Sequence, residues 1–114
     1  MDEITKLQAT VLRALANPTR LEILHLLADS PVGVGRLAAS LAVSQPNVSQ
    51  HLAVLRTTGL VDVDRGGREA SYRLADPDVL VACALMRRVL ERRLARLSQL
   101  ADSARMPNLL IPLS

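Results

Sequence analysis

The spacing of hydrophobic residues changes from a helical period to strict alternation at residue 60, and it returns to a helical period at residue 79. Residues 61–64 and 70–74 alternate between apolar and polar side chains on either side of Gly66-Gly67. Two alternating runs around a Gly-Gly pair predict a β-hairpin, and the flanking stretches have the period of amphipathic helices. The chain is therefore expected to be mostly α-helical, with one small hairpin before the last helix.

The register of the predicted hairpin follows from pairing its two runs symmetrically about the Gly-Gly centre. This pairing places the valines of the first run on one face with two residues of the second: Val61 opposite Tyr72, and Val63 opposite Ala70. It also places Asp64 opposite Glu69, a like-charge pair that costs roughly a few tenths of a kcal/mol. Arg65 and Arg68 flank the glycines, and they are expected to offset this repulsion.

Five helices are expected, and two of them have clear start signals. Asn17 before Pro18, and Ser44 two residues before Pro46, are good N-caps with proline in the first turn. Ala42-Val43 forms a tight corner between the third and fourth helices. The expected helices cover residues 3–16, 18–28, 34–41, 44–57 and 79–105. The tail, residues 106–114, contains two prolines and four large aliphatic residues, and its structure is not assigned.

Short helices followed by a hairpin are the pattern of a winged helix-turn-helix. The helix-turn-helix is predicted over residues 34–57 and a two-stranded wing over residues 60–74, within a single domain, residues 1–114. In such folds the second helix of the pair enters the major groove of DNA with its first turns. Val48, Leu52 and Leu55 follow the i, i+4, i+7 pattern, so they should face the core and turn the polar residues outward.

The predicted DNA-binding residues lie at the start of that helix and at the hairpin tip. Glutamine and asparagine can pair with adenine, and serine hydroxyls at a helix N-terminus suit phosphates. Arginines at the tip suit phosphates or a narrow minor groove. The alternatives are an ordinary polar helix face and solvated turn residues, and His51 could equally pack at the helix flank. The candidates are Ser44, Gln45, Pro46, Asn47, Ser49, Gln50, His51, Arg65 and Arg68.

Composition excludes several other classes of function. The chain has one aromatic residue, Tyr72, which argues against RNA binding by stacked aromatics. One cysteine and two histidines provide neither a disulfide framework nor a typical zinc site. We expect no enzyme activity and no cofactor, because there is no nucleophile motif and no glycine-rich phosphate loop. The acidic opening is unlike a secretory signal and no apolar run reaches the ~20 residues of a membrane span, so a cytoplasmic protein is expected.

The first and last helices carry more apolar residues than one small core needs, which predicts a homodimer joined by residues 1–16 and 79–105. The last helix has a long apolar seam: Val79, Ala82, Cys83, Met86, Val89, Leu90, Leu94, Leu97 and Leu100. Arg88, Arg92 and Arg96 are expected on another face. This basic stripe suits solvent, and a site for an acidic ligand is the alternative.

Residues 12–74 resemble the arsenic-repressor (ArsR/SmtB) family of bacterial dimeric repressors. The resemblance rests on LRALANPTRLEILHLL, LAVSQPNVSQHLAVLRTTGLV and RGGREASYRL, of which SQPNVSQHLAVLR is similar to the family's recognition helix. It implies a homodimer that binds a palindromic operator in double-stranded DNA through residues 44–57 and the wing. It also implies repression that an inducer relieves.

The family's sensing residues do not carry over to this chain. The two cysteine positions of the arsenic-type site are Gly33 and Gly35 here. The four positions of the zinc-type site on the last helix are Asp78, Leu80, Glu91 and Leu94. Two carboxylates do not make a transition-metal site, so no metal is expected.

The signal that controls the predicted regulator is therefore unknown. Cys83 is the remaining candidate sensor, either as a redox switch or as a small buried hydrophobic residue, which the sequence favours. The competing function is a protein–protein interaction module that kept the winged-helix fold without operator binding. The polar residues at the start of the fourth helix argue against that alternative.

Overall fold

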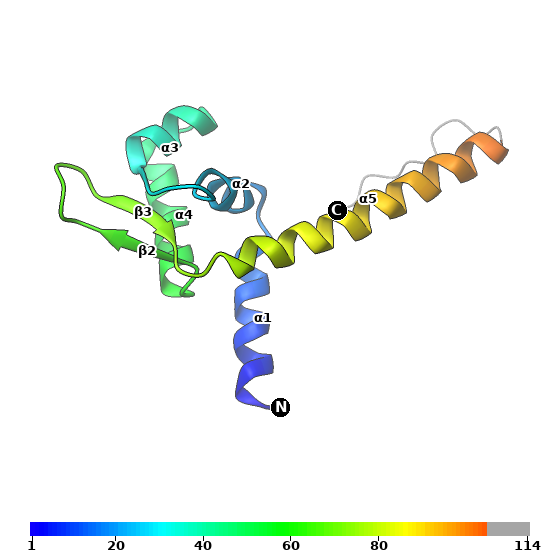
Figure 1. The fold of residues 1–114 in the computed structure, drawn as a ribbon, viewed down its shortest axis with the longest axis horizontal. Helices are drawn as coiled ribbons and strands as arrows, with labels where there is room; N and C mark the ends of the chain where they lie inside the picture. Colours follow the sequence, from blue (N-terminus) through cyan, green and yellow to red (C-terminus); the bar gives the residue numbers. More distant parts are fainter. Residues whose placement is uncertain (105–114) are drawn as a thin grey trace. The chain divides into compact units, whose positions relative to one another are not determined.

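A computed structural model of the protein describes residues 1–104, so the predicted tail lies outside the described residues. The elements in order are α1 (Glu3–Leu15), α2 (Pro18–Leu26), β1 (Val32–Gly33), α3 (Val34–Leu41), α4 (Gln45–Thr57), β2 (Val61–Asp64), β3 (Ser71–Leu74) and α5 (Asp78–Ala104) (Figure 1). The helices agree with the predicted ranges to within two residues at each end. Within residues 1–104, no helix combines the length and apolar character needed to cross a membrane.

The chain forms two compact units, of which the first is Met1–Leu80 and the second begins at Val81, inside α5. Aliphatic side chains from α1 to α4 and from β2 make the core of the first unit. Its buried members are Ala14, Ile23, Leu24, Leu27, Leu37, Ala38, Val48, Leu52, Leu55, Leu60 and Val61. Because α2, α3 and α4 contribute most of the large buried residues, the two helices of the helix-turn-helix are fixed by the same core.

Side-chain caps start three of the helices, and two of these caps were predicted. The Thr5 backbone N–H donates to Asp2 Oδ1 at 2.8 Å, and hydrogen bonds with Thr5 lower the pKa of the Asp2 carboxyl below its ordinary value. The Arg20 backbone N–H donates to Asn17 Oδ1 at 3.1 Å, which confirms the predicted start of α2. Ser44 caps α4 in the same way. Each cap satisfies one of the backbone donors that a helix start leaves free.

The predicted register of the hairpin is wrong by two residues. Val63 pairs with Tyr72 and Asp64 with Ser71, so residues 65–70 connect the strands in place of a two-residue Gly-Gly turn. Asp64 Oδ1 accepts a hydrogen bond from the Gly66 backbone N–H at 2.9 Å, which starts this longer connection. The observed register leaves Asp64 and Glu69 unpaired with each other and places Asp62 opposite Arg73. Opposite charges at facing positions stabilise a sheet, whereas like charges destabilise it.

The wing is also joined by a third strand that the sequence did not predict. β1 pairs antiparallel with β3, with Val32 opposite Tyr72 and Gly33 opposite Ser71, so the sheet order is β1-β3-β2. A strand of two residues is too short to show alternation in a sequence. Because Gly33 directly precedes α3, β1 attaches the wing to the start of the helix-turn-helix.

Candidate DNA-binding surface

The turn between α3 and α4 depends on one residue in the left-handed conformation. Ala42 has φ 55°, and the next backbone N–H, from Val43, donates to the Ala38 carbonyl at 3.1 Å. The Ala42 N–H donates to the Ala39 carbonyl at 3.3 Å, which completes a Schellman motif. The chain therefore reverses over residues 42–44, as the predicted tight corner requires.

Three fully buried side chains fix the rotation of α4 about its axis. Val48, Leu52 and Leu55 are at most 1% exposed, and they follow the predicted i, i+4, i+7 spacing. At the end of α4, Gly59 has φ 80°, and the Leu60 backbone N–H donates to the Leu55 carbonyl at 2.9 Å. Since one face of α4 is held in the core from its first turn to its end, the opposite face is presented to solvent.

The polar residues predicted for base and phosphate contacts gather at the first half of that solvent face. Ser44 accepts a hydrogen bond at Oγ from the Asn47 backbone N–H at 3.2 Å, so this serine is a helix cap as well as a candidate contact. Gln50 is two residues after Val48, or about 200° around the helix from the core. His51 is half-buried at the flank. The exposed candidates are Ser44, Gln45, Pro46, Asn47, Ser49 and Gln50.

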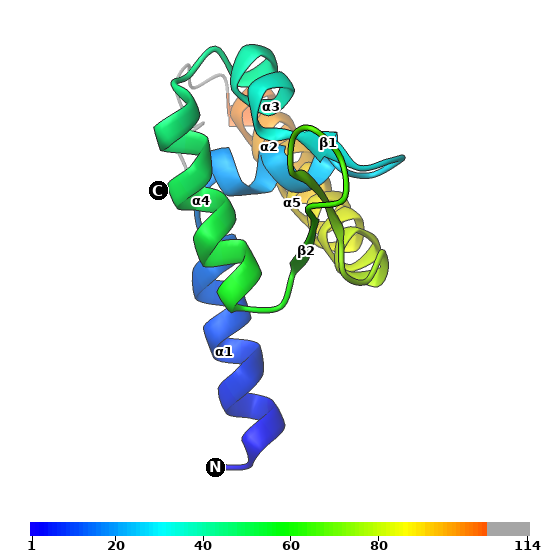
Figure 2. The same cartoon turned by 90° about the vertical axis from the view of Figure 1, so that its left-hand side faces the viewer.

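The two arginines of the wing lie in the six-residue connection between β2 and β3, and both are exposed. Figure 1 shows this connection projecting from the sheet, and Figure 2, which looks onto the projecting end, shows α4 beside the wing. Arg65 and Arg68 are thus exposed in the connection of a wing that lies beside α4. The structure places the predicted helix and wing residues on the same compact unit, Met1–Leu80.

Glu69, in the connection between β2 and β3, has a structural role that was not predicted from the sequence. Glu69 entered the sequence prediction only as the residue opposite Asp64. In the structure its Oε1 accepts a hydrogen bond from the Gly35 backbone N–H at 3.0 Å, across 34 residues of sequence. The available signal was Gly33, which is the N-cap of α3 and has no side chain with which to cap it.

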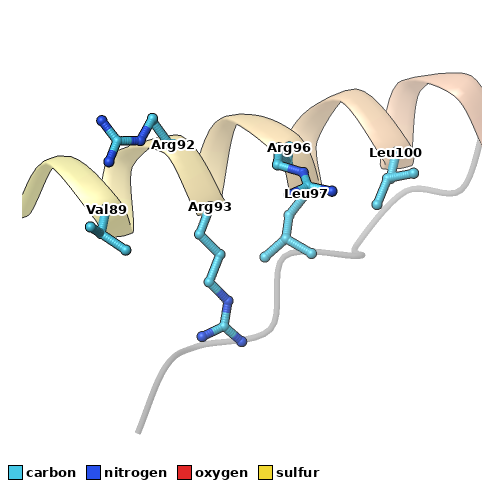
Figure 3. A pocket seen from close by; sticks show the side chains of 6 residues that line it. All are labelled: Val89, Arg92, Arg93, Arg96, Leu97 and Leu100. Carbon is cyan, nitrogen blue, oxygen red and sulfur yellow. The ribbon is translucent and has the colours of Figure 1, made fainter.

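The predicted basic stripe of α5 is exposed at all three positions, Arg88, Arg92 and Arg96. Arg92 and Arg96 also border a groove along α5 with Val89, Arg93, Leu97 and Leu100. In Figure 3 the Arg92 side chain points to the opposite side of the helix from Val89 and Leu97. Cys83 is half-buried on this helix.

Glycines occupy the two positions at the start of α3 where the resemblance would place arsenic ligands. A β-carbon built on Gly33 would be 2.9 Å from Cδ of Glu69, so this carboxylate occupies the space above the glycine. Within residues 1–104, no three His, Cys, Asp or Glu side chains are grouped so as to hold a metal ion.

Comparisons with known proteins agree with this geometry. The family model described as "Bacterial regulatory protein, arsR family" matches residues 17–63. The chain is 38% identical over 103 residues to the uncharacterized HTH-type transcriptional regulator Rv0081 of Mycobacterium tuberculosis, covering 89% of this chain and 90% of that protein. It is 47% identical over 74 residues to the repressor SmtB of the same species, covering 65% and 55%. It is 36% identical over 89 residues to the transcriptional activator HlyU of Vibrio cholerae, covering 78% and 82%.

Solved structures show the same fold. The crystal structure of Rv0081 matches with a TM-score of 0.74 and 36% identity, covering 84% of this chain and 97% of that one. The solution structure of the homodimeric winged helix-turn-helix domain Mb0332 from Mycobacterium bovis matches with a TM-score of 0.73 and 34% identity, covering 82% and 86%. The chain therefore belongs to the ArsR family of bacterial winged helix-turn-helix proteins, which are DNA-binding transcriptional regulators and not enzymes.

Proposed function

We propose that this chain is a homodimeric repressor that binds a palindromic operator, with α4 of each subunit in the major groove of one half-site. The observation that carries the proposal is the polar, exposed first half of α4, opposite three fully buried anchors. A helix fixed in this way presents the same side chains to every duplex that it meets. The repressor SmtB, similar over 74 residues, supports repression, whereas the name of HlyU describes an activator.

Within this proposal the contacts divide by chemistry. Gln45, Asn47 and Gln50 carry amides that can form paired hydrogen bonds with a base edge. Ser44 carries a hydroxyl at the positive end of the α4 dipole, where phosphates are favoured, and Ser49 carries a second hydroxyl on the exposed face of the helix. Arg65 and Arg68 bind the backbone from the wing, and His51 contacts phosphate from the flank of α4.

Operator binding is tested directly with DNA from upstream of the protein's own coding region. We expect a gel shift at a protein concentration about 10³-fold or more below that needed for an unrelated duplex of equal length. Equal affinity for both duplexes at physiological salt would favour the competing function, a protein-interaction module without operator recognition.

Gln50→Ala should change sequence preference rather than general affinity. We expect operator binding to weaken by about 1–3 kcal/mol for each half-site, because one base contact is lost in each, with binding to unrelated DNA unchanged. Competition gel shifts with single-base variants of the operator would locate the affected position. Gln99→Ala, which truncates an exposed glutamine on α5, is the matched control. If Gln50→Ala weakens binding to all duplexes equally, this side chain does not read bases.

We also propose that release from the operator does not respond to the metals of the family's usual sites. Each chain has one thiol and two histidines, and these three residues lie on three different helices. They can form neither a tetrahedral zinc set nor a three-thiolate arsenite set within a chain. Titrating the operator complex with zinc, nickel, cadmium or arsenite at stoichiometric levels should therefore leave it bound. Release with an affinity tighter than micromolar would overturn this part of the proposal.

Peroxide distinguishes the remaining signals. Release by peroxide that disappears in Cys83→Ser would identify this half-buried cysteine as a redox switch. Persistent binding under peroxide leaves a small organic ligand, or no inducer, as the explanation.

A further inference from the structure

The carboxylate of Glu69 rests against the first turn of α3. Its Oε1 accepts a hydrogen bond from the Gly35 backbone N–H at 3.0 Å. A β-carbon on Gly33 would be 2.9 Å from both Cδ and Oε1 of Glu69, which is closer than side chains pack. The carboxylate therefore occupies space that a side chain at position 33 would share, and it would have to shift if residue 33 were larger than glycine.

The contact supplies what the start of α3 lacks. The N-cap of α3 is Gly33, whereas the N-caps of α1, α2 and α4 are residues whose side chains accept a hydrogen bond from the helix. Free backbone donors and the positive end of the dipole favour an anion at this place. Glu69 provides the missing cap from 34 residues away in sequence.

The same contact fixes the part of the wing that the sheet does not hold. Strand pairing ends at Asp64 and Ser71, so the connection between them, which includes Arg68, has no ladder hydrogen bonds. Glu69 follows Arg68 directly and ties this connection to α3. The side-chain Nε2 of Gln45, the first residue of α4, lies 3.6 Å from a β-carbon built on Gly35. The wing connection and the starts of α3 and α4 therefore meet at one place.

We propose that Glu69 is a positioning residue for DNA binding, which holds the wing arginines in a fixed relation to α4. This inference rests on the proposed operator binding. Glu69 itself need not touch DNA, and its negative charge opposes binding to phosphates. A positioning role thus predicts that removing the Glu69 side chain weakens operator binding, whereas simple electrostatics predicts that it strengthens operator binding.

Three variants separate the two roles. Glu69→Ala removes the contact and the charge, and we expect roughly 3- to 10-fold weaker operator binding, as when a typical helix-cap contribution of about 1 kcal/mol is lost from the bound state. Gly33→Ala changes no charge but forces the end of the Glu69 side chain to shift, and it should weaken binding by no more than Glu69→Ala does. Glu69→Gln keeps an oxygen acceptor for the Gly35 N–H, so it should restore most of the affinity. Glu22→Ala removes an exposed carboxylate from α2 of the same compact unit and is the matched control, with binding equal to or tighter than wild type.

The measurements are operator affinity by fluorescence anisotropy, amide hydrogen exchange at Gly35, and the thermal midpoint of each variant. We expect faster Gly35 exchange in Glu69→Ala and Gly33→Ala, and a smaller effect of Arg68→Ala in the Glu69→Ala background than in wild type. If Glu69→Ala fails to fold, Gly33→Ala and Glu69→Gln still decide the question. Glu69→Ala binding as tightly as Glu22→Ala would overturn the positioning role alone, as would Gly33→Ala that binds like wild type although its Gly35 amide exchanges faster. Failure of the wild type to prefer its operator would instead overturn the proposed function, and the positioning role with it.

Discussion

Leu90→Glu is expected to convert the protein to a monomer and to abolish operator binding at micromolar concentration. Leu90 is 40% exposed in the single chain, and Val89 beside it is 55% exposed. In a symmetric dimer the substitution places two carboxylates in the interface. Burying a charge without a partner costs several kcal/mol, so the dimer should weaken by roughly 10³-fold or more.

The exposed apolar residues of two helices are the basis for this expectation. On α1 they are Ile4, Leu7 and Leu12, and on α5 they are Val81, Leu85, Met86, Val89, Leu90, Leu94 and Leu100. A stable monomer rarely exposes so many large aliphatic side chains on so few turns. The homodimeric domain Mb0332, which has the same fold at 34% identity, supports a second copy as the partner.

Sedimentation velocity at micromolar protein, with circular dichroism on the same samples, is the measurement. Gln99→Glu is the control, because it adds the same charge to α5 at an exposed polar position about 200° around the helix from the seam residue Val79. This variant should remain dimeric and bind DNA. A folded wild-type monomer at micromolar concentration would contradict the dimer, as would a dimeric Leu90→Glu.

The second large effect is expected from the wing. Arg65→Ala combined with Arg68→Ala should weaken binding to every duplex, because both side chains are proposed to contact phosphates rather than bases. A dimer loses about four phosphate contacts, so the slope of log K against log salt should fall by about four units. Affinity should fall by about 10²-fold or more at 0.1 M salt.

The appropriate control removes the same charge elsewhere. Arg88→Ala combined with Arg92→Ala takes two exposed guanidinium groups from α5, each about 200° around the helix from the seam residue Leu90 and outside the proposed DNA surface. This pair should leave the salt slope nearly unchanged. If the two double variants lower the slope equally, only net charge matters, and the wing has no specific role.

The helix-turn-helix could be predicted from sequence because its determinants are local. Asn17 and Ser44 act as caps within three residues of the backbone groups that they bind. Val48, Leu52 and Leu55 define the buried face of α4 by spacing alone, and that face also fixes Gln50 on the exposed side. The predicted contact residues of α4 follow from this one pattern.

The wing could not be predicted to the same detail, because its geometry depends on distant residues. The two-residue strand β1 exists only through its pairing with Tyr72 and Ser71. The connection of residues 65–70 is held at one end by a local hydrogen bond to Asp64 and at the other by the contact of Glu69 with Gly35. The local sequence favours a symmetric Gly-Gly hairpin. It does not show that Glu69 supplies a hydrogen-bond acceptor to the start of α3, because the two are 34 residues apart.

The central claim, that a dimer reads a two-fold symmetric operator with its two α4 helices, is tested most directly by methylation interference on the protein's own upstream DNA. Methylation of guanine N7 blocks contacts in the major groove, whereas methylation of adenine N3 blocks contacts in the minor groove. The proposal predicts two interfering clusters of inverted sequence, with centres one helical turn apart, about 10–10.5 base pairs, or a whole multiple of it. A single cluster, or interference without inverted symmetry, would contradict it.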